Sequence, residues 1–243
     1  MKTTLLSLLH AGVGVLLLLF FLPATTPLQA QEAVAPHNAY EHILPQRITV
    51  QQHILPAHWE LLGSAMGDLN KDQIADLVLV TRCADPSVIV TWQNEYQTER
   101  YNPSPNLLAI YWGEKDGTWR LYKVYPELIA PEDEYTENSF SDIQITNKGV
   151  LDITTQYFPK DRGHEITRDT HRFRFQNGAF YLIGLEMWQE YSNGHYQTDS
   201  HNYLTGDHIT TIEKWDDEDA TPTPKHTNTG KEPLRTLDQM ENL

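Results

Sequence analysis

The stretch HRFRFQNGAFYLIG, residues 171–184, decides the fold class. Apolar and basic side chains alternate before Asn177-Gly178, so that Phe173 and Phe175 share one face and the neighbouring arginines share the other. Asn-Gly between two such runs is the strongest short signal of a β-hairpin, because both residues of its tight turn need a positive φ. The run after the turn is more apolar, as in a buried central strand. We therefore predict an antiparallel pair closed at Asn177-Gly178, with both phenylalanines facing the core and the arginines facing outward.

Strand-like runs of the same kind, separated by short polar links that end in glycine, occur along most of the chain. Helical periodicity is weak: residues 125–130 are expected to form a short turn of helix, and residues 131–137 an acidic loop. This pattern predicts a mainly β fold of antiparallel hairpins, arranged as a meander, a sandwich or partial propeller-like sheets, with few short helices. The predicted strand runs are 59–62, 74–81, 88–92, 107–112, 118–125, 143–145, 150–157, 170–176, 180–188 and 209–215.

One segment carries a specific chemical pattern. Counting from Asp68 as the first position, oxygen-bearing side chains fall at the third, fifth and ninth positions, which are Asn70, Asp72 and Asp76. This is the spacing of an EF-hand-type calcium loop, in which the seventh residue, here Ile74, contributes its backbone carbonyl. Calcium is a hard cation that takes roughly six to eight oxygen ligands, and a tight loop gathers several of them. The candidate calcium ligands are therefore the side chains of Asp68, Asn70, Asp72 and Asp76 and the backbone carbonyl of Ile74.

The segment departs from such a loop at two positions. Gln73 stands where a glycine normally supplies the sharp turn, and Leu79 stands where the loop would end in a bidentate glutamate. The second departure is expected when the loop leads into a strand, as the apolar run 77–80 indicates. The alternative is that the aspartates and the asparagine only form Asx-turns between two strands, because such turns favour the same residue types.

Residues 67–72, followed by 76–80, resemble the calcium loop of FG-GAP and VCBS-type repeats, which occur in integrin-like β-propellers. In those repeats the positions that match the four candidate side-chain ligands bind Ca²⁺. A wider set of segments resembles a group of bacterial exported proteins and lipoproteins that carry one such loop; the resemblance spans roughly residues 55–215. It implies export and a β-rich fold but no assigned activity, and a single loop does not support a complete propeller. The wider set consists of the loop and residues 112–118, 173–184 and 202–206.

The N-terminus has the order of a secretory signal. Lys2 gives a short positive region, residues 13–22 form an apolar core that closes at Pro23, and residues 28–30 offer a small-residue cleavage site. We expect cleavage after Ala30 and a mature chain in the periplasm or outside the cell. The alternative is an uncleaved anchor helix, because the apolar stretch is almost long enough to span a bilayer. No cysteine lies at the cleavage site, so a lipoprotein is not expected.

Composition divides the chain into four parts: a signal peptide at 1–30, a leader segment at 31–57, a single β-rich domain at 58–215, and an acidic tail with Pro and Thr at 216–243. The tail is expected to be largely disordered, although its stretch 233–237 can dock back as a short terminal segment. No second apolar run of spanning length follows the signal, so no transmembrane segment is expected after cleavage. The net charge of −15 at pH 7 argues against nucleic-acid binding, which needs clustered basic residues.

No catalytic motif is recognisable. Residues 63–67 have the wrong spacing for a nucleophile elbow, and His171 follows residues 164–165 too late for a His-Glu-x-x-His zinc site. Cys83 follows an apolar run and is expected to be a small buried hydrophobe, without an internal disulfide. Three histidines are expected to be scattered over the surface, and the alternative is that they converge in space: His195, His201 and His208.

We therefore expect an exported, non-enzymatic module that binds a protein or glycan partner or supports an envelope structure, and that calcium stabilises. The alternative is a secreted or periplasmic hydrolase with a dispersed active site, since paired carboxylates meet only in the folded chain. Tyr191, Tyr196 and Tyr203 are expected mainly in the core or in cross-strand pairs; lining a sugar or peptide surface is the other role open to them.

Overall fold

The described part of the chain folds into antiparallel β-sheets with hardly any helix, which confirms the predicted fold class. The computed structural model describes residues 40, 42–49, 55–93, 98–160, 166–192, 194–214 and 222–243. The strands of this part are β1 (Arg47–Ile48), β2 (Trp59–Gly67), β3 (Asp76–Cys83), β4 (Val90–Gln93), β5 (Thr98–Tyr101), β6 (Asn106–Gly113), β7 (Trp119–Ile129), β8 (Phe140–Ile145), β9 (Val150–Tyr157), β10 (Ile166–Gln176), β11 (Ala179–Tyr191), β12 (His195–Asn202), β13 (Asp207–Lys214) and β14 (Lys225–Asn228). Short 3₁₀ turns are η2 (Pro86–Val88) and η3 (Leu237–Gln239).

The hairpin predicted from residues 171–184 is confirmed as the pair β10 and β11. Asn177 and Gly178 close it with φ angles of 51° and 83°, the left-handed values that the tight turn requires. Phe173 is fully buried, and Phe175 packs against the same core. The arginine before Phe173 reaches carboxylates of neighbouring strands on the opposite face. The predicted register is therefore correct.

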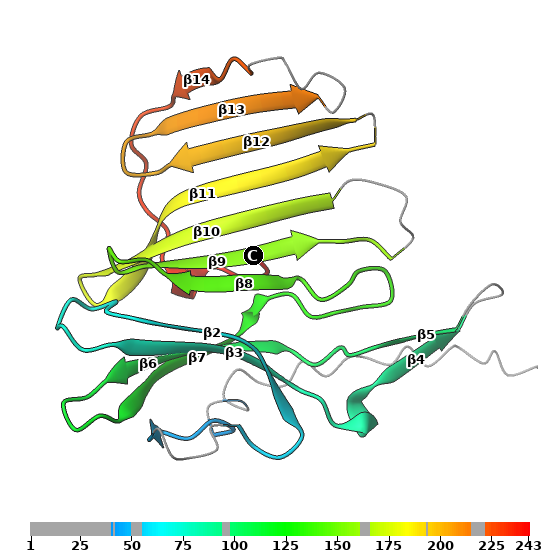
Figure 1. The fold of residues 1–243 in the computed structure, drawn as a ribbon, viewed down its shortest axis with the longest axis vertical. Helices are drawn as coiled ribbons and strands as arrows, with labels where there is room; N and C mark the ends of the chain where they lie inside the picture. Colours follow the sequence, from blue (N-terminus) through cyan, green and yellow to red (C-terminus); the bar gives the residue numbers. More distant parts are fainter. Residues whose placement is uncertain are drawn as a thin grey trace, which may run out of the picture. The chain divides into compact units, whose positions relative to one another are not determined.

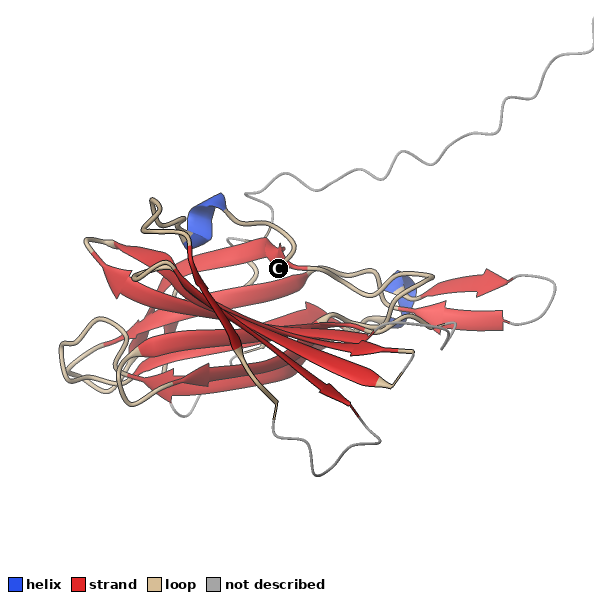
Figure 2. Ribbon diagram, turned by 90° about the horizontal axis from the view of Figure 1, so that it is seen from above, coloured by secondary structure: helices blue, strands red, loops and turns tan. Residues whose placement is uncertain are grey.

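The described strands form two large sheets and one separate hairpin (Figure 1). The five-stranded sheet has the order β1-β7-β6-β3-β2, and the seven-stranded sheet has the order β14-β13-β12-β11-β10-β9-β8. The seven-stranded sheet is a simple meander, because each of its strands pairs with the next one along the chain. Figure 2 shows the hairpin of β4 and β5 extending beyond both sheets.

The five-stranded sheet is buried on both faces. One face packs against the seven-stranded sheet in a core that includes Val78 and Phe173. The other face is covered by parts of the segment before β2, whose Leu44 is fully buried in a second core together with Ile48 of the edge strand β1. Strands covered on both faces read as continuous apolar runs, which is the pattern of β3 and β6. Part of the expected leader segment 31–57 is therefore a structural component of the folded body.

Two glycines allow the edge strands of the two sheets to touch. β2 packs along β8. A Cβ atom placed on Gly63 would lie 2.6 Å from Cζ of Phe140, and one placed on Gly67 would lie 2.5 Å from Cγ2 of Ile145. These separations are much shorter than van der Waals contact between carbons. The two glycines, which do not fit a nucleophile motif in the sequence, therefore serve close packing.

Some strands differ from the sequence-based expectation. The helical turn expected at 125–130 is wrong, because these residues mostly continue β7, where burial on both faces gives an apolar run without alternation. β1, β5, β12 and β14 were not predicted. β12 contains no aliphatic residue and β14 is exposed throughout, so neither has the apolar alternation that marks a half-buried strand.

The end of the chain also differs from the expectation. Residues 222–243, predicted as part of a largely disordered tail, have defined positions: β14 pairs with β13, and Leu237 is buried in the core between the sheets. The N–H of Leu243 donates to the carbonyl of Leu128 over 2.8 Å. One buried leucine and a few backbone hydrogen bonds dock this polar segment, as was foreseen only for its stretch 233–237.

The described part of the chain contains no helix that is long and apolar enough to cross a membrane. The predicted signal peptide, residues 1–30, and its cleavage site lie outside the described residues. Both stay predictions from the sequence.

We expect Gly67→Ala to lower the free energy of unfolding by about 1–3 kcal/mol, because the added methyl group has to displace Ile145 in a packed contact. The matched control is Ser64→Ala at an exposed position of the same strand, which should change stability by less than about 0.5 kcal/mol. Urea unfolding followed by circular dichroism measures both. Equal unfolding midpoints for Gly67→Ala and the native chain would contradict the packing role.

Candidate functional site

The predicted calcium loop connects β2 to β3, and its side chains hydrogen-bond to its own backbone. Asp68 accepts the N–H of Asp72 at Oδ1 (3.1 Å) and the N–H of Gln73 at Oδ2 (3.0 Å). Asn70 Oδ1 also accepts from Asp72 (2.9 Å), and Asp72 Oδ1 accepts the N–H of Ile74 (2.8 Å). The three polar side chains therefore turn toward the loop backbone, as in successive Asx-turns.

Asp76 is the buried member of the predicted set. Its side chain is fully buried, and its two oxygens accept the N–H of Leu69 (2.8 Å) and the N–H of Gly113 (2.9 Å). Burial raises the pKa of this carboxyl; the backbone N–H groups oppose that effect, and the negative charge of Asp72 adds to it. Asp76 thus joins the start of the loop to the end of β6, while the fully buried Leu69 anchors the loop in the core.

Gln73 adopts the conformation that glycine normally supplies in a calcium loop. Its φ is 70°, in the left-handed region that non-glycine residues rarely occupy. A neighbouring turn and the end of β6 pack closely on the loop: a Cβ atom on Gly149 would collide with the carbonyl of Asp68, and one on Gly113 would collide with the carbonyl of Ala75. Surroundings packed this closely hold a strained backbone conformation in place. The missing glycine therefore does not prevent the turn.

The donor chemistry and the turn fit a calcium ion. Oxygens from Asp68, Asn70 and Asp72 are the ligands that Ca²⁺ prefers. Asp76 is brought to the same loop, but both of its oxygens already accept backbone N–H groups. Within the described ranges, no three His, Cys, Asp or Glu side chains are arranged as a group that holds a metal. The hydrogen bonds within the loop match the Asx-turn alternative. The side chains that accept them are also the ones that would bind calcium.

A second polar cluster, not expected from the sequence, lies on the core-facing side of the seven-stranded sheet. His201 and His208 are cross-strand partners whose rings stack with centroids 3.9 Å apart. Nε2 of His208 lies 2.9 Å from Oδ1 of Asp199, which also accepts the hydroxyl of Thr210 over 2.6 Å. The expectation of scattered histidines is therefore wrong for this pair, whereas His195 lies at the other end of β12.

His171 continues this row of side chains toward the core. It lies on the same side of β10 as Phe173, and its buried Nδ1 has no hydrogen-bond partner. Burial, with a smaller contribution from the positive charge of Arg235, lowers the pKa of His171 to about 4. Burial and then the neighbouring His208 lower the pKa of His201 as well. His171 and His201 are therefore neutral at pH 7.

The opposite side of the seven-stranded sheet, which we name the outward face, carries a charged row. On this face Nε of Arg172 lies 3.7 Å from Oδ2 of Asp152, and a terminal nitrogen of Arg172 lies 3.4 Å from Oε2 of Glu186. The other oxygen of Asp152 is buried without a hydrogen-bond partner. Burial raises the pKa of Asp152, and the charge of Arg172 counteracts this. One guanidinium therefore holds two carboxylates from neighbouring strands.

An aromatic pair lies next to this row on the outward face. The ring centroids of Trp188 and Tyr196 are 5.8 Å apart, and the ring planes are tilted by 30°. The guanidinium of Arg168 lies over the Trp188 ring, 5.9 Å from its centroid. Tyr196 is thus in a cross-strand aromatic pair, as expected, but on a sheet face that no described element covers.

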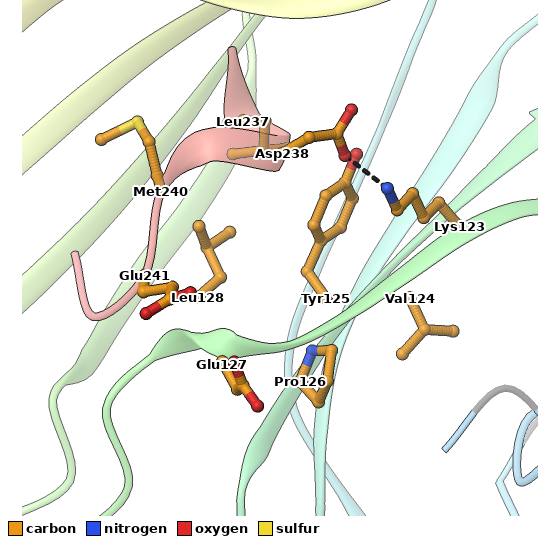
Figure 3. Close-up of a pocket in the computed structure, with 10 residues that line it drawn as sticks. All are labelled: Lys123, Val124, Tyr125, Pro126, Glu127, Leu128, Leu237, Asp238, Met240 and Glu241. Atoms are coloured by element: carbon orange, nitrogen blue, oxygen red, sulfur yellow. Dashed lines mark hydrogen bonds and ion pairs between the residues drawn. The ribbon is translucent and has the colours of Figure 1, made fainter. Parts of the chain in front are cut away.

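Figure 3 shows a pocket of about 220 Å³ between β7 and the C-terminal segment. The hydroxyl of Tyr125 points to Asp238, whose carboxylate also pairs with Nζ of Lys123 at 2.5 Å. Burial raises the pKa of Tyr125, so its hydroxyl stays protonated. Glu127 and Glu241 also line the pocket, and their carboxylates do not point toward one another. The contacts of Asp238 therefore fasten the tail to β7, and the pocket does not bring its two glutamates together as a pair of carboxylates.

The chain matches no protein-family model, no curated protein and no solved structure. The candidate sites are therefore judged from their geometry. The sequence singled out the loop side chains, whose role as calcium ligands stays a prediction, and it missed the outward face. The signal that was present is the alternation in β10 and β11, where every second residue beyond the core is polar or aromatic: Arg168, Thr170 and Arg172, then Glu186, Trp188 and Glu190.

We expect stability to fall as the pH is lowered from 6.5 toward 4, because His171 is neutral in the folded chain. Its pKa is about 4 when folded and 6.5 in the reference state, so the unfolded chain binds the proton first. Above the pKa of the unfolded chain, the contribution of neutral His171 to the free energy of unfolding is fully present. As the pH falls through this window the contribution is lost, and the free energy of unfolding decreases by roughly 2–3 kcal/mol.

Urea unfolding at a series of pH values, with the native chain and His171→Leu, measures this contribution. The variant should have a flatter stability profile between pH 6.5 and 4. The exposed His226 gives the control: His226→Gln should keep the native slope. Parallel profiles for His171→Leu and the native chain would contradict the role assigned to His171.

Proposed function

We propose that this protein is an exported binding module without catalytic activity, and that its binding surface is the outer part of the seven-stranded sheet. The observation that supports this proposal is that β12 and β13 make their extensive contacts only with neighbouring strands of their own sheet. Figure 1 shows them, with β14, beyond the strands that adjoin the five-stranded sheet. No described element packs extensively on either of their faces.

Such a layer is unusual in a globular domain, because a sheet normally buries at least one face. The residues of β12 are half-buried along almost its whole length, and none is aliphatic. Cross-strand pairs and backbone hydrogen bonds, not a core, stabilise this layer. A layer on whose faces no described element packs extensively offers a large surface to a partner, and aromatic residues such as Trp188 and Tyr196 are enriched at binding surfaces.

The proposed partner is a protein or a glycan of the cell envelope or the medium. The signal pattern before residue 31 supports export to the periplasm or beyond, without a lipid anchor. The net charge of −15 disfavours nucleic acid and anionic lipid as ligands.

A hydrolase is the second candidate function, and the pair Asp152 and Glu186 is the observation that favours it. Two carboxylates on one face can act as acid and base where their environments separate their pKa values, and burial raises the pKa of Asp152. Arg172 contacts both, however, and its positive charge lowers the pKa of Asp152 against the effect of burial. This arrangement suits ligand binding better than proton transfer.

We also propose that Ca²⁺ stabilises the loop between β2 and β3. Asp68, Asn70, Asp72 and Asp76 would hold the ion, with the carbonyl of Ile74. The support is the concentration of three carboxylates in one short loop together with the left-handed turn described above. A bound cation would offset the repulsion among these carboxylates, so its role would be structural.

We expect the melting temperature to be roughly 5 °C higher in excess Ca²⁺ than in excess chelator, if the ion is supplied at about 100 times its dissociation constant. Asp72→Ala should abolish the difference. Asp116→Ala is the matched control, because Asp116 is an exposed carboxylate in another turn, and it should preserve the difference. Superimposable melting curves for the native chain would leave only the Asx-turn alternative.

The binding proposal predicts that a partner protects the outer strands from hydrogen exchange. The mature chain is incubated with sonicated envelope material of its native host, washed, and analysed by mass spectrometry after exchange in heavy water. We expect peptides from β11–β13 to exchange at least about tenfold more slowly than in the free chain, while peptides from the buried β6 remain unchanged. Failure of the chain to be retained, or retention without protection of β11–β13, would contradict the proposal.

A further inference from the structure

We propose that the outward face of the seven-stranded sheet binds a glycan chain, with Trp188 and Tyr196 as the stacking platform. The inference rests on the proposed function and names the ligand class of that surface. It is carried by the juxtaposition of an aromatic pair, two guanidinium groups and several carboxylates on neighbouring strands of a face that no described element covers.

The register of the strands places these groups together. Arg168 pairs with Trp188 between β10 and β11, and Trp188 pairs with Thr198 between β11 and β12. Two residues further along β11, Glu190 pairs with Tyr196. Cross-strand partners and every second residue of a strand share one face of a sheet. The five side chains therefore form a single patch.

The aromatic pair presents two rings from neighbouring strands. Their centroids are 5.8 Å apart and their planes are tilted by 30°, so the two rings are in contact and form one aromatic surface patch. The C–H groups on one side of a pyranose ring pack against such a surface, while the phenol and indole supply polar ends. Arg168 lies over the Trp188 ring, which restricts the indole and brings guanidinium donors beside it.

Groups that recognise hydroxyls surround the platform. Glu186 and Glu190 lie two residues before and after Trp188 on the same face. Arg172 links Glu186 to Asp152, and the second oxygen of Asp152 is an acceptor without a partner. Sugar hydroxyls both donate and accept hydrogen bonds, and charged acceptors and donors bind them strongly. A patch that alternates carboxylates and guanidinium groups suits such a ligand.

The composition of the patch favours a glycan over other partners. Its positive and negative charges are mixed, whereas a polyanion needs clustered positive charge. A protein interface normally has an apolar centre, whereas the positions around the charges here are mainly hydroxyl-bearing. These positions are Thr154, Thr170, Thr198, Ser200 and Thr211.

The test titrates the full mature chain with cellohexaose, chitohexaose and maltohexaose, one at a time, by isothermal titration calorimetry. We expect saturable binding of at least one of these oligosaccharides. Trp188→Ala should weaken it about tenfold or more, and Trp188→Tyr, which keeps a ring, should restore most of the affinity. Trp92→Ala removes a tryptophan from the separate β4–β5 hairpin and should leave the affinity unchanged. Arg168→Gln should weaken binding severalfold, and it replaces Trp188→Ala if thermal melting shows that variant to be unfolded.

Two results would overturn the inference: no binding of any of the three oligosaccharides at millimolar concentration, or binding that the Trp188 and Arg168 variants leave unchanged. If envelope material still protects β11–β13 from exchange in the first case, the proposed function stands and its ligand belongs to another class, such as a protein. If that protection is absent as well, the proposed function fails together with the glycan inference.

Discussion

The buried carboxylate of Asp76 is the interaction on which the body of this protein depends. β3 is apolar and buried on both faces, so a shift of its register by one residue would exchange one set of buried aliphatic side chains for another. Hydrophobic burial alone therefore specifies this register weakly. Asp76 removes the ambiguity, because its two oxygens accept the N–H of Leu69 and the N–H of Gly113, and a slipped strand would leave a buried carboxylate unpaired. The loop between β2 and β3 is thus part of the mechanism that aligns the five-stranded sheet, with or without an ion.

Once that sheet is aligned, both of its faces need a cover, and the chain provides two different ones. The seven-stranded sheet covers one face, with Gly63 and Gly67 bringing the edge strands into contact. The segment before β2 covers the other through Leu44 and Leu55. Leu237 of the tail then enters the core between the sheets. The two ends of the described chain therefore complete cores that the central strands cannot close by themselves.

The sequence predicted those features that depend on neighbours along the chain. The alternation and the Asn-Gly turn of residues 171–184 fix a local hairpin, and the spacing of polar residues after Asp68 fixes a local turn. The features it did not predict depend on contacts between distant segments or lack apolar alternation. Nothing near His201 in the sequence indicates that it stacks on His208, since the register of β12 and β13 creates that contact. β12 itself was missed because a strand without a core-facing apolar side carries no periodic signal.

β10 and β11 carry both the core residues that the sequence predicted and the outward-face residues that it did not. At their inner ends β10 and β11 place Phe173 and Leu182 in the core, and at their outer ends they carry Arg168 and Trp188 on the outward face. A register shift separates the two regions, between the pair Arg172–Gly184 and the pair Phe173–Leu182. Beside this shift the Arg172 side chain reaches carboxylates of the strands on both sides, Asp152 of β9 and Glu186 of β11. The hairpin that is fixed by core packing therefore also holds the polar groups of the outward face in place before any ligand arrives, which reduces the ordering cost of binding.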